Sequence, residues 1–197
     1  MSYPTPDQIV SLSTVCVGVG TAGSTSMLAC VSFTRIICIE GEPLLDVFVR
    51  PTMQVTDYRA AITGLQDRHL FSKDAVSFDQ LQRRVADMLG GKIVVGHRLW
   101  QDLSVTGVPH PAASTRDVAL YRPFQNALKS PNQIVGLQTL CWEFMRRRCQ
   151  DDFLDPIENA RVAIDLYRSH AAEWETTILR HDWPCALPPS SFSAYYL

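Results

Sequence analysis

The sequence predicts an α/β protein with a mixed β-sheet, on two observations. Three apolar segments rich in β-branched residues follow one another near the N-terminus, separated by short turn-rich stretches, which is the pattern of an antiparallel meander. Farther along, amphipathic helical segments alternate with apolar strands, which favours parallel pairing through helical crossovers. A hydrophobic content of 46% with only 19% charged residues indicates a packed core. We therefore expect a five-stranded mixed sheet flanked by helices.

The meander strands are expected at 13–19, 27–33 and 44–51. "GTAGSTS" separates the first two apolar runs, and "EGEP" precedes the third. The charge-free stretch 8–34 is long enough to span a membrane, but it is rich in Gly, Ser and Thr. That composition favours two buried strands and a turn over a membrane span.

The helix–strand alternation begins with an amphipathic helix over 77–89. Ser77 and Gln80 have the spacing of a capping box, and apolar residues follow at steps of three and four. The remaining expected elements are strands at 92–97 and 114–120 and helices at about 135–149 and 156–179. Asp155 has the position and residue type of an N-cap for the last helix. We expect a single domain over 1–179, followed by a Pro- and aromatic-rich C-terminal tail over 180–197.

The bulk composition restricts the partners. A net charge of −2 gives no overall attraction for nucleic acid or an anionic membrane, so such a partner must be held by a local patch. The six cysteines form no C-x-x-C pair and mostly lie in apolar segments, which is typical of free thiols in a reducing compartment. The N-terminal residues lack the pattern of a secretory signal. We expect an intracellular protein, nuclear or cytoplasmic, that does not enter a membrane.

One glycine pattern suggests a dinucleotide site. Gly18, Gly20 and Gly23 form a literal G-x-G-x-x-G after a predicted strand. The mechanism also requires a helix next, whose N-terminus receives the pyrophosphate, and the following "STSMLACVSFT" has poor helix-forming composition. A flexible connection between strands is the better interpretation, and dinucleotide binding is a minor alternative.

The histidines and one basic run are the remaining candidate sites in the sequence. The five histidines show no ligand spacing for zinc. The run "RRR" at 146–148 has the residue type for phosphate contacts, yet a short basic run near a helix end is commonly just solvated.

Four spaced segments together resemble the DEDDh 3′-to-5′ exonucleases. They are "VRPTMQVTDYRAAITGL" (49–65), "KIVVGHRLWQDL" (92–103), "TRDVALYRPF" (115–124) and "ENARVAIDLYRSHAAEWE" (158–175). The chain is most similar to the branch of interferon-stimulated and ribosomal-RNA-processing RNA exonucleases. The resemblance implies a ribonuclease-H-like fold and, in active members, two Mg²⁺ or Mn²⁺ ions held by four acidic residues beside a histidine base.

The resemblance also locates the catalytic positions, and most of them are replaced here. The D-x-E motif falls on Ser13 and Val15, and the H-x-x-x-x-D motif falls on Leu154 and Asn159. Only Asp102 keeps the family's residue. Four of five catalytic positions are thus lost, so we predict no metal cofactor and a polar, structural role for Asp102, bonded to Ser13, Asn159 or a nearby backbone N–H.

Nearby acids are the remaining source of a metal site. Asp155 lies four residues before Asn159, but its use as a helix cap is the simpler expectation. Asp151 and Asp152 belong to a segment whose position the sequence does not fix.

The leading hypothesis is a catalytically inactive exonuclease-like protein that acts by binding. A basic concave strip leading to Asp102 would favour nucleic acid, whereas an apolar plug around Val15 and Leu154 would favour a protein partner or a homo-oligomer. The alternatives are a weakly active exonuclease with relocated acids and a pocket used for another ligand. The candidate nucleic-acid-binding residues are Arg59, His97, Arg98, Arg122, Arg146, Arg147 and Arg148.

Overall fold

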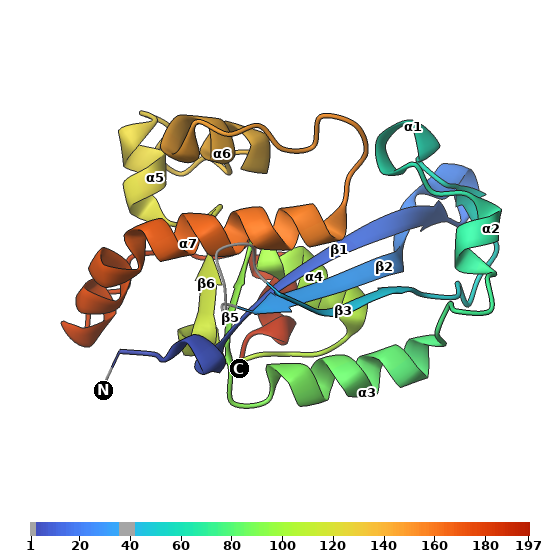
Figure 1. Cartoon of the computed structure of the whole chain (residues 1–197), viewed down its shortest axis with the longest axis horizontal. Helices are drawn as coiled ribbons and strands as arrows, with labels where there is room; N and C mark the ends of the chain where they lie inside the picture. Colours follow the sequence, from blue (N-terminus) through green and yellow to red (C-terminus); the bar gives the residue numbers. More distant parts are fainter. Residues whose placement is uncertain (1–2, 36–41) are drawn as a thin grey trace.

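The computed structural model describes residues 3–35 and 42–197. A central sheet is covered by helices on both faces (Figure 1). Helix α7 (Pro156–Leu179) crosses one face, with α5 (Arg122–Ala127) and α6 (Leu137–Met145) packed beyond it. Helices α3 (Phe78–Leu89) and α4 (Leu99–Thr106) cover the other face. The predicted α/β architecture with a mixed sheet is confirmed.

The sheet has the strand order β3-β2-β1-β5-β6, and a short sixth strand, β4, pairs with β1 beside it. Its strands are β1 (Ile9–Val19), β2 (Thr25–Arg35), β3 (Glu42–Phe48), β4 (Val55–Asp57), β5 (Ile93–Gly96) and β6 (Thr115–Asp117). The first three strands form the expected antiparallel meander, and β5 and β6 continue the sheet in parallel with β1. The strand β4 was not anticipated, because three residues are too short to show a period.

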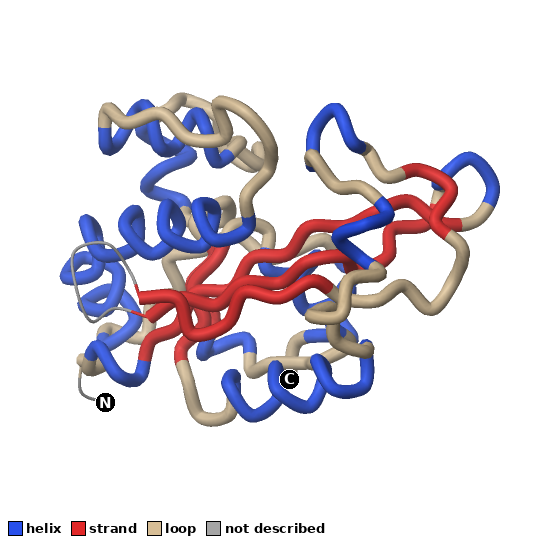
Figure 2. The backbone as a smooth tube through the Cα atoms, turned by 45° about the vertical axis from the view of Figure 1, so that its right-hand side comes forward, coloured by secondary structure: helices blue, strands red, loops and turns tan. Residues whose placement is uncertain are grey.

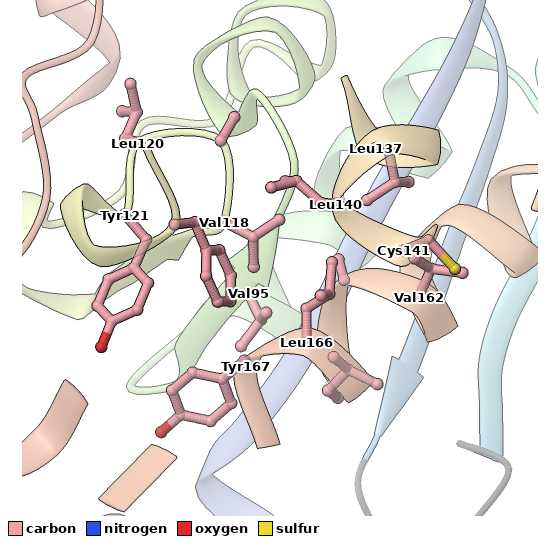
Figure 3. Packing of buried hydrophobic residues seen from close by; sticks show 14 of the residues in the cluster. Val95, Val118, Leu120, Tyr121, Leu137, Leu140, Cys141, Val162, Leu166 and Tyr167 are labelled. Carbon is pink, nitrogen blue, oxygen red and sulfur yellow. The ribbon is translucent and has the colours of Figure 1, made fainter. Parts of the chain in front are cut away.

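Alternation along the strands assigns side chains to the two faces. Val95 joins the core under α6 and α7, whereas its neighbour Val94 joins the core under α3 and α4. Figure 3 shows the first of these cores, in which Val95 and Val118 from the sheet side meet Leu140, Val162 and Leu166 from the helices.

The helix over 77–89 begins as predicted. Ser77 Oγ accepts the Gln80 N–H at 3.3 Å, and Gln80 Oε1 accepts the Ser77 N–H at 3.2 Å, which completes the capping box. Two one-turn helices, α1 (Ala60–Thr63) and α2 (Asp67–Leu70), lie at the far end of the meander. Among the described residues, no helix combines the length and apolarity needed to cross a membrane.

The G-x-G-x-x-G stretch does not open a helix, so the dinucleotide-binding alternative is wrong. Gly18 lies in β1, and Gly20 and Gly23 form a turn that leads directly into β2. Both turn glycines have positive φ, of 73° and 70°. Gly18 and Gly23 also pack so closely that a Cβ on Gly18 would lie 2.8 Å from the Gly23 Cα. The glycines therefore serve a tight hairpin.

The C-terminal segment after α7 lies against the body of the protein. Arg122 and Leu120 exchange backbone hydrogen bonds with Pro184 and Ala186, at 2.9 and 2.7 Å. A short 3₁₀ segment, η4 (Ser190–Tyr195), then contacts α4, and His110 bonds through its backbone to Tyr195 and Leu197. The tail thereby covers the edge next to β6.

Candidate nucleic-acid cleft

A cleft opens where the meander runs on beyond the short parallel strands. Figure 2 shows β1 and β2 extending past the rest of the sheet. Strand β5 ends at Gly96, where a Cβ would lie 2.9 Å from the Leu12 carbonyl oxygen, and the chain then turns into α4. A crevice beyond the carboxyl end of a parallel strand is the usual ligand site of an α/β sheet. The cleft has a volume of about 690 Å³, within the range of ligand sites.

The five positions assigned by resemblance to the catalytic set lie together in this cleft. They come from three separate parts of the chain: β1, α4, and the start of α7 with its preceding loop. The loop is held by a backbone bond from the Leu154 N–H to the Ile62 carbonyl of α1, at 2.8 Å. The lining residues that belong to the set are Ser13, Val15, Asp102, Leu154 and Asn159.

Asp102 is buried in the first turn of α4, not in a loop after β5. Its Oδ1 accepts two hydrogen bonds from Thr14, one from the backbone N–H at 3.1 Å and one from the hydroxyl at 2.6 Å. Burial raises the pKa of Asp102 well above its ordinary value, although both Thr14 bonds act in the opposite direction. The bond to a nearby backbone N–H was anticipated, whereas Ser13 and Asn159 do not supply the partner.

Asp117 holds the helix that carries Asp102. Its Oδ1 accepts the N–H groups of Arg98 and Ala119, and its Oδ2 accepts the N–H of Leu99 at 2.7 Å. The bonds from Arg98 and Leu99 satisfy donors at the start of α4 that have no partner within the helix. Burial raises the pKa of Asp117 to about 7 against these favourable bonds.

The other four positions assigned by resemblance carry apolar or neutral side chains. Val15 is 4% exposed and belongs to an apolar cluster beside β1 and β2, against which Leu154 packs. Asn159 is engaged elsewhere, since its Oδ1 accepts the Gln150 side-chain N–H at 2.6 Å. Ser13 is half-buried and lines the cleft.

This donor set does not fit two divalent ions. Mg²⁺ and Mn²⁺ prefer carboxylate, carbonyl and water oxygens, and a two-ion site needs several carboxylates. Asp102 is the one carboxylate among the described lining residues, and Thr14 already occupies its Oδ1. In the described parts of the chain, no group of three His, Cys, Asp or Glu side chains is arranged to hold a metal ion.

The nearby acids lie in a different depression. Asp155 caps α7, its Oδ1 accepting the Ile157 N–H at 2.9 Å, as predicted. Asp151, Asp152 and Asp155 line a hollow with Glu158 and Asp165 that shares none of the cleft's described lining residues. They therefore do not complete a carboxylate set around Asp102.

Two arginines line the cleft. Arg98 has a left-handed backbone (φ 63°) at the N-terminus of α4, and its buried Nε donates to no group in the described residues. Arg59, also left-handed, donates from Nη2 to Ser26 Oγ at 3.1 Å. A buried donor without a partner costs about 1–3 kcal/mol, more for a charged group.

His97 lines the same cleft without contributing charge at neutral pH. Its Nε2 lies 2.8 Å from the Val135 carbonyl oxygen, a bond that fixes the ring. Burial lowers the pKa of His97 to about 4, so the imidazole is neutral at pH 7.

The remaining basic candidates lie outside the cleft. Arg122 is exposed at the start of α5. Arg146 pairs with Glu143 at 3.5 Å, and Arg147 pairs with Asp165 at 3.1 Å. Arg148 lines the acid-rich hollow near α7. The run at 146–148 is thus embedded among acids, which weakens its attraction for phosphate.

The sequence did not reveal three residues that shape the cleft. Thr14, the partner of Asp102, lies between the two positions assigned to the D-x-E motif. That position in the motif is the one sequence feature that could have pointed to Thr14. Gln150 and Phe192 come from segments without periodicity, and Phe192 belongs to the C-terminal tail.

The chain is similar to RNA exonucleases of several organisms. No protein-family model matches the chain. RNA exonuclease 4 of Cryptococcus neoformans is 37% identical over 179 residues, which are 91% of this chain and 42% of that protein. RNA exonuclease 4 of Homo sapiens is 37% identical over 160 residues, 81% of this chain and 36% of that protein. The chain thus spans about two fifths of the length of these relatives.

Solved structures share the fold. The Pan2 catalytic unit of Neurospora crassa aligns over 100% of this chain and 30% of its own, with a TM-score of 0.73 at 20% identity. The Saccharomyces cerevisiae Pan2 pseudoubiquitin hydrolase–RNA exonuclease module in complex with AAUUAA RNA aligns over 88% of this chain and 30% of its own, with a TM-score of 0.72 at 22% identity. Over most of its own length the chain is a homologue of the RNA exonuclease 4 proteins, and it has the ribonuclease-H-like fold of the Pan2 exonuclease structures.

Proposed function

We propose that this chain binds single-stranded nucleic acid in the cleft without metal ions and does not cleave it. The observation that carries the proposal is the set of charged residues that line the cleft, which consists of two arginines and one buried carboxylate. Active members of the family neutralise phosphate with metals held by carboxylates. Here Arg59 and Arg98 supply the positive charge directly.

The apolar replacements support loss of cleavage more than a protein-binding surface. Val15 and Leu154 join an internal apolar cluster and leave an open cleft of about 690 Å³ beside it. The names of the relatives, RNA exonuclease 4, and the RNA bound to a Pan2 module of the same fold favour RNA as the ligand. The proposal includes an intracellular site of action, nuclear or cytoplasmic, which the free thiols of five described cysteines support.

Cleavage is tested with 5′-labelled single-stranded RNA and DNA in Mg²⁺ or Mn²⁺. We expect the RNA and the DNA substrate to remain full length, because one carboxylate cannot hold two ions. A ladder of 3′-shortened products that Asp102→Asn abolishes would overturn the proposal and support the weakly active exonuclease with relocated acids.

Binding is tested by fluorescence anisotropy in EDTA over a series of salt concentrations. With two arginines contacting phosphates, the slope of log K against log[salt] for a single strand should be about −1.4. Arg98→Gln should weaken binding and reduce the magnitude of the slope by about 0.7. The matched control is Arg148→Gln, outside the cleft, which should bind like the natural protein. Absence of binding at low salt would refute the proposal and favour a protein partner.

A further inference from the structure

A second hollow continues the cleft toward the C-terminal tail. It has a volume of about 470 Å³ and lies between β2, α4 and η4. The two hollows share four lining residues, Ser26, Ser104, Val105 and Phe192. They therefore form one continuous track along the surface, with Phe192 at their junction.

The tail holds Phe192 in place before any ligand arrives. The Phe192 N–H donates to the Pro189 carbonyl at 2.9 Å, and the His110 N–H donates to the Tyr195 carbonyl at 2.9 Å. The Leu197 N–H donates to the His110 carbonyl at 3.1 Å, so two hydrogen bonds to His110 hold the C-terminal end of this turn. The phenyl ring is half-buried and contributes to both hollows.

Along the track, the lining changes from charged side chains to uncharged ones that include hydroxyl groups and aromatic rings. Arg98 and Arg59 line the first hollow, and Arg59 contacts Ser26 at the junction. Beyond Phe192, the described lining of the second hollow contains no charged side chain and includes Phe78 and Tyr195. Positive charge followed by aromatic rings is the arrangement with which proteins hold the backbone and the unpaired bases of single strands.

Resting on the proposed function, we infer that Phe192 is a base-stacking residue supplied by the C-terminal tail, and that the track holds at least two nucleotides of a single strand. The arginines bind phosphate in the first hollow, and the phenyl ring stacks on a base at the junction. A duplex, whose bases are paired and stacked on one another, cannot offer a free base face to this ring.

The test compares two RNA hexamers by anisotropy: an ordinary single strand and one with abasic sugars at its two 3′-terminal positions. Phe192→Ala should weaken binding of the ordinary strand by roughly 10-fold, because stacking on one base is lost. The same substitution should leave binding of the abasic strand nearly unchanged, which a general structural role would not do. Phe192→Tyr should retain the natural affinity, and an RNA duplex should bind more weakly than the single strand.

The controls separate this inference from the proposed function. Phe71→Ala removes an aromatic side chain that is 52% exposed and lines neither hollow, so binding should not change. If Phe192→Ala destabilises the fold, Phe192→Leu keeps an apolar side chain without a ring and should show the same selective loss. If Arg98→Gln weakens binding while the Phe192 variants behave like Phe71→Ala, the inference is overturned and the proposed function stands. If the natural protein binds no strand, both fail.

Discussion

At the scale of single residues, Asp102 is a buried carboxylate that serves as a hydrogen-bond acceptor. Its side chain is 6% exposed, and its Oδ1 accepts both the N–H and the hydroxyl of Thr14. These bonds tie α4 to β1 on one side of the cleft. The carboxylate is an acceptor within the fold, and that role does not require a negative charge.

Substitutions at Asp102 distinguish the role of its side chain as a hydrogen-bond acceptor from the role of its negative charge. Asp102→Asn keeps an oxygen at the position that Thr14 uses, so the free energy of unfolding at pH 7 should stay the same or rise. Asp102→Ala leaves two Thr14 donors without an acceptor and should lower it by about 1–3 kcal/mol. Urea denaturation measures both. A larger loss for Asn than for Ala would contradict the acceptor role.

The stability of the natural protein should depend on pH more strongly than that of Asp102→Asn. A carboxyl whose pKa is raised by folding binds its proton more tightly in the folded state, so stability is greatest below the unfolded pKa of about 3.9 and falls as the pH rises toward the folded pKa. Burial raises the pKa of Asp102 in this way and that of Asp117 to about 7. Stability should therefore fall between about pH 4 and 7, and less steeply in Asp102→Asn. Parallel curves for the two proteins would exclude a raised pKa at Asp102.

At the scale of elements, the start of α7 decides where the nearby acids point. Asp155 accepts the Ile157 N–H, and Pro156 follows as the first helical residue. This arrangement keeps the Asp155 carboxylate at the helix end, in the hollow lined by other acids. A residue only four positions from Asn159 is thereby directed away from Asp102.

Asp155→Ala should lower the free energy of unfolding by about 1 kcal/mol, because the first turn of α7 loses its capping acceptor. The loss should be equal in EDTA and in Mn²⁺, since the carboxylate does not bind a metal in this interpretation. Asp155→Ser should recover most of the stability, and Asp152→Ala, in the exposed loop, should change little. A loss that appears only in Mn²⁺ would assign Asp155 to a metal site.

At the scale of the whole molecule, the cleft depends on segments far apart in the sequence. Residues from β1, α4, α7 and the tail meet because parallel pairing of β1 with β5 sets α4 against β1, and α7 crosses both strands. The assignment of the lost catalytic positions therefore has a test that involves all of these segments together.

The variant Ser13→Asp, Val15→Glu, Leu154→His and Asn159→Asp should rebuild an ion site around Asp102. Without metal it should be less stable than the natural protein, because close carboxylates repel one another. Mn²⁺ at 100 times its dissociation constant should add about 2.7 kcal/mol, or roughly 5–10 °C in Tm for a chain of this size. The natural protein should not respond. Adding Asp102→Asn to the variant should reduce the shift, and a folded variant without any shift would show that the positions are misassigned.

The sequence by itself determined the layers of the fold and the prediction that four of the five catalytic positions assigned by resemblance carry other residues. Helical and strand periods, the capping box at Ser77 and the residues at the family's catalytic positions are local information, readable without knowledge of distant contacts. The short elements β4, α1 and α2 were not predicted, because each spans fewer residues than are needed to show a periodic pattern.

Only the tertiary structure decided which side chains meet in the cleft and which hydrogen bonds they form. Whether Asp102 meets Thr14, Ser13 or Asn159 depends on how α4 docks against β1, and whether Asp155 reaches the cleft depends on a cap at one helix end. The tail has no regular period, so the position of Phe192 follows from the hydrogen bonds of Tyr195 and Leu197 to His110 and from the contact of η4 with α4. Such contacts join residues far apart in the chain, and their free energies depend on burial and geometry that sequence spacing does not specify.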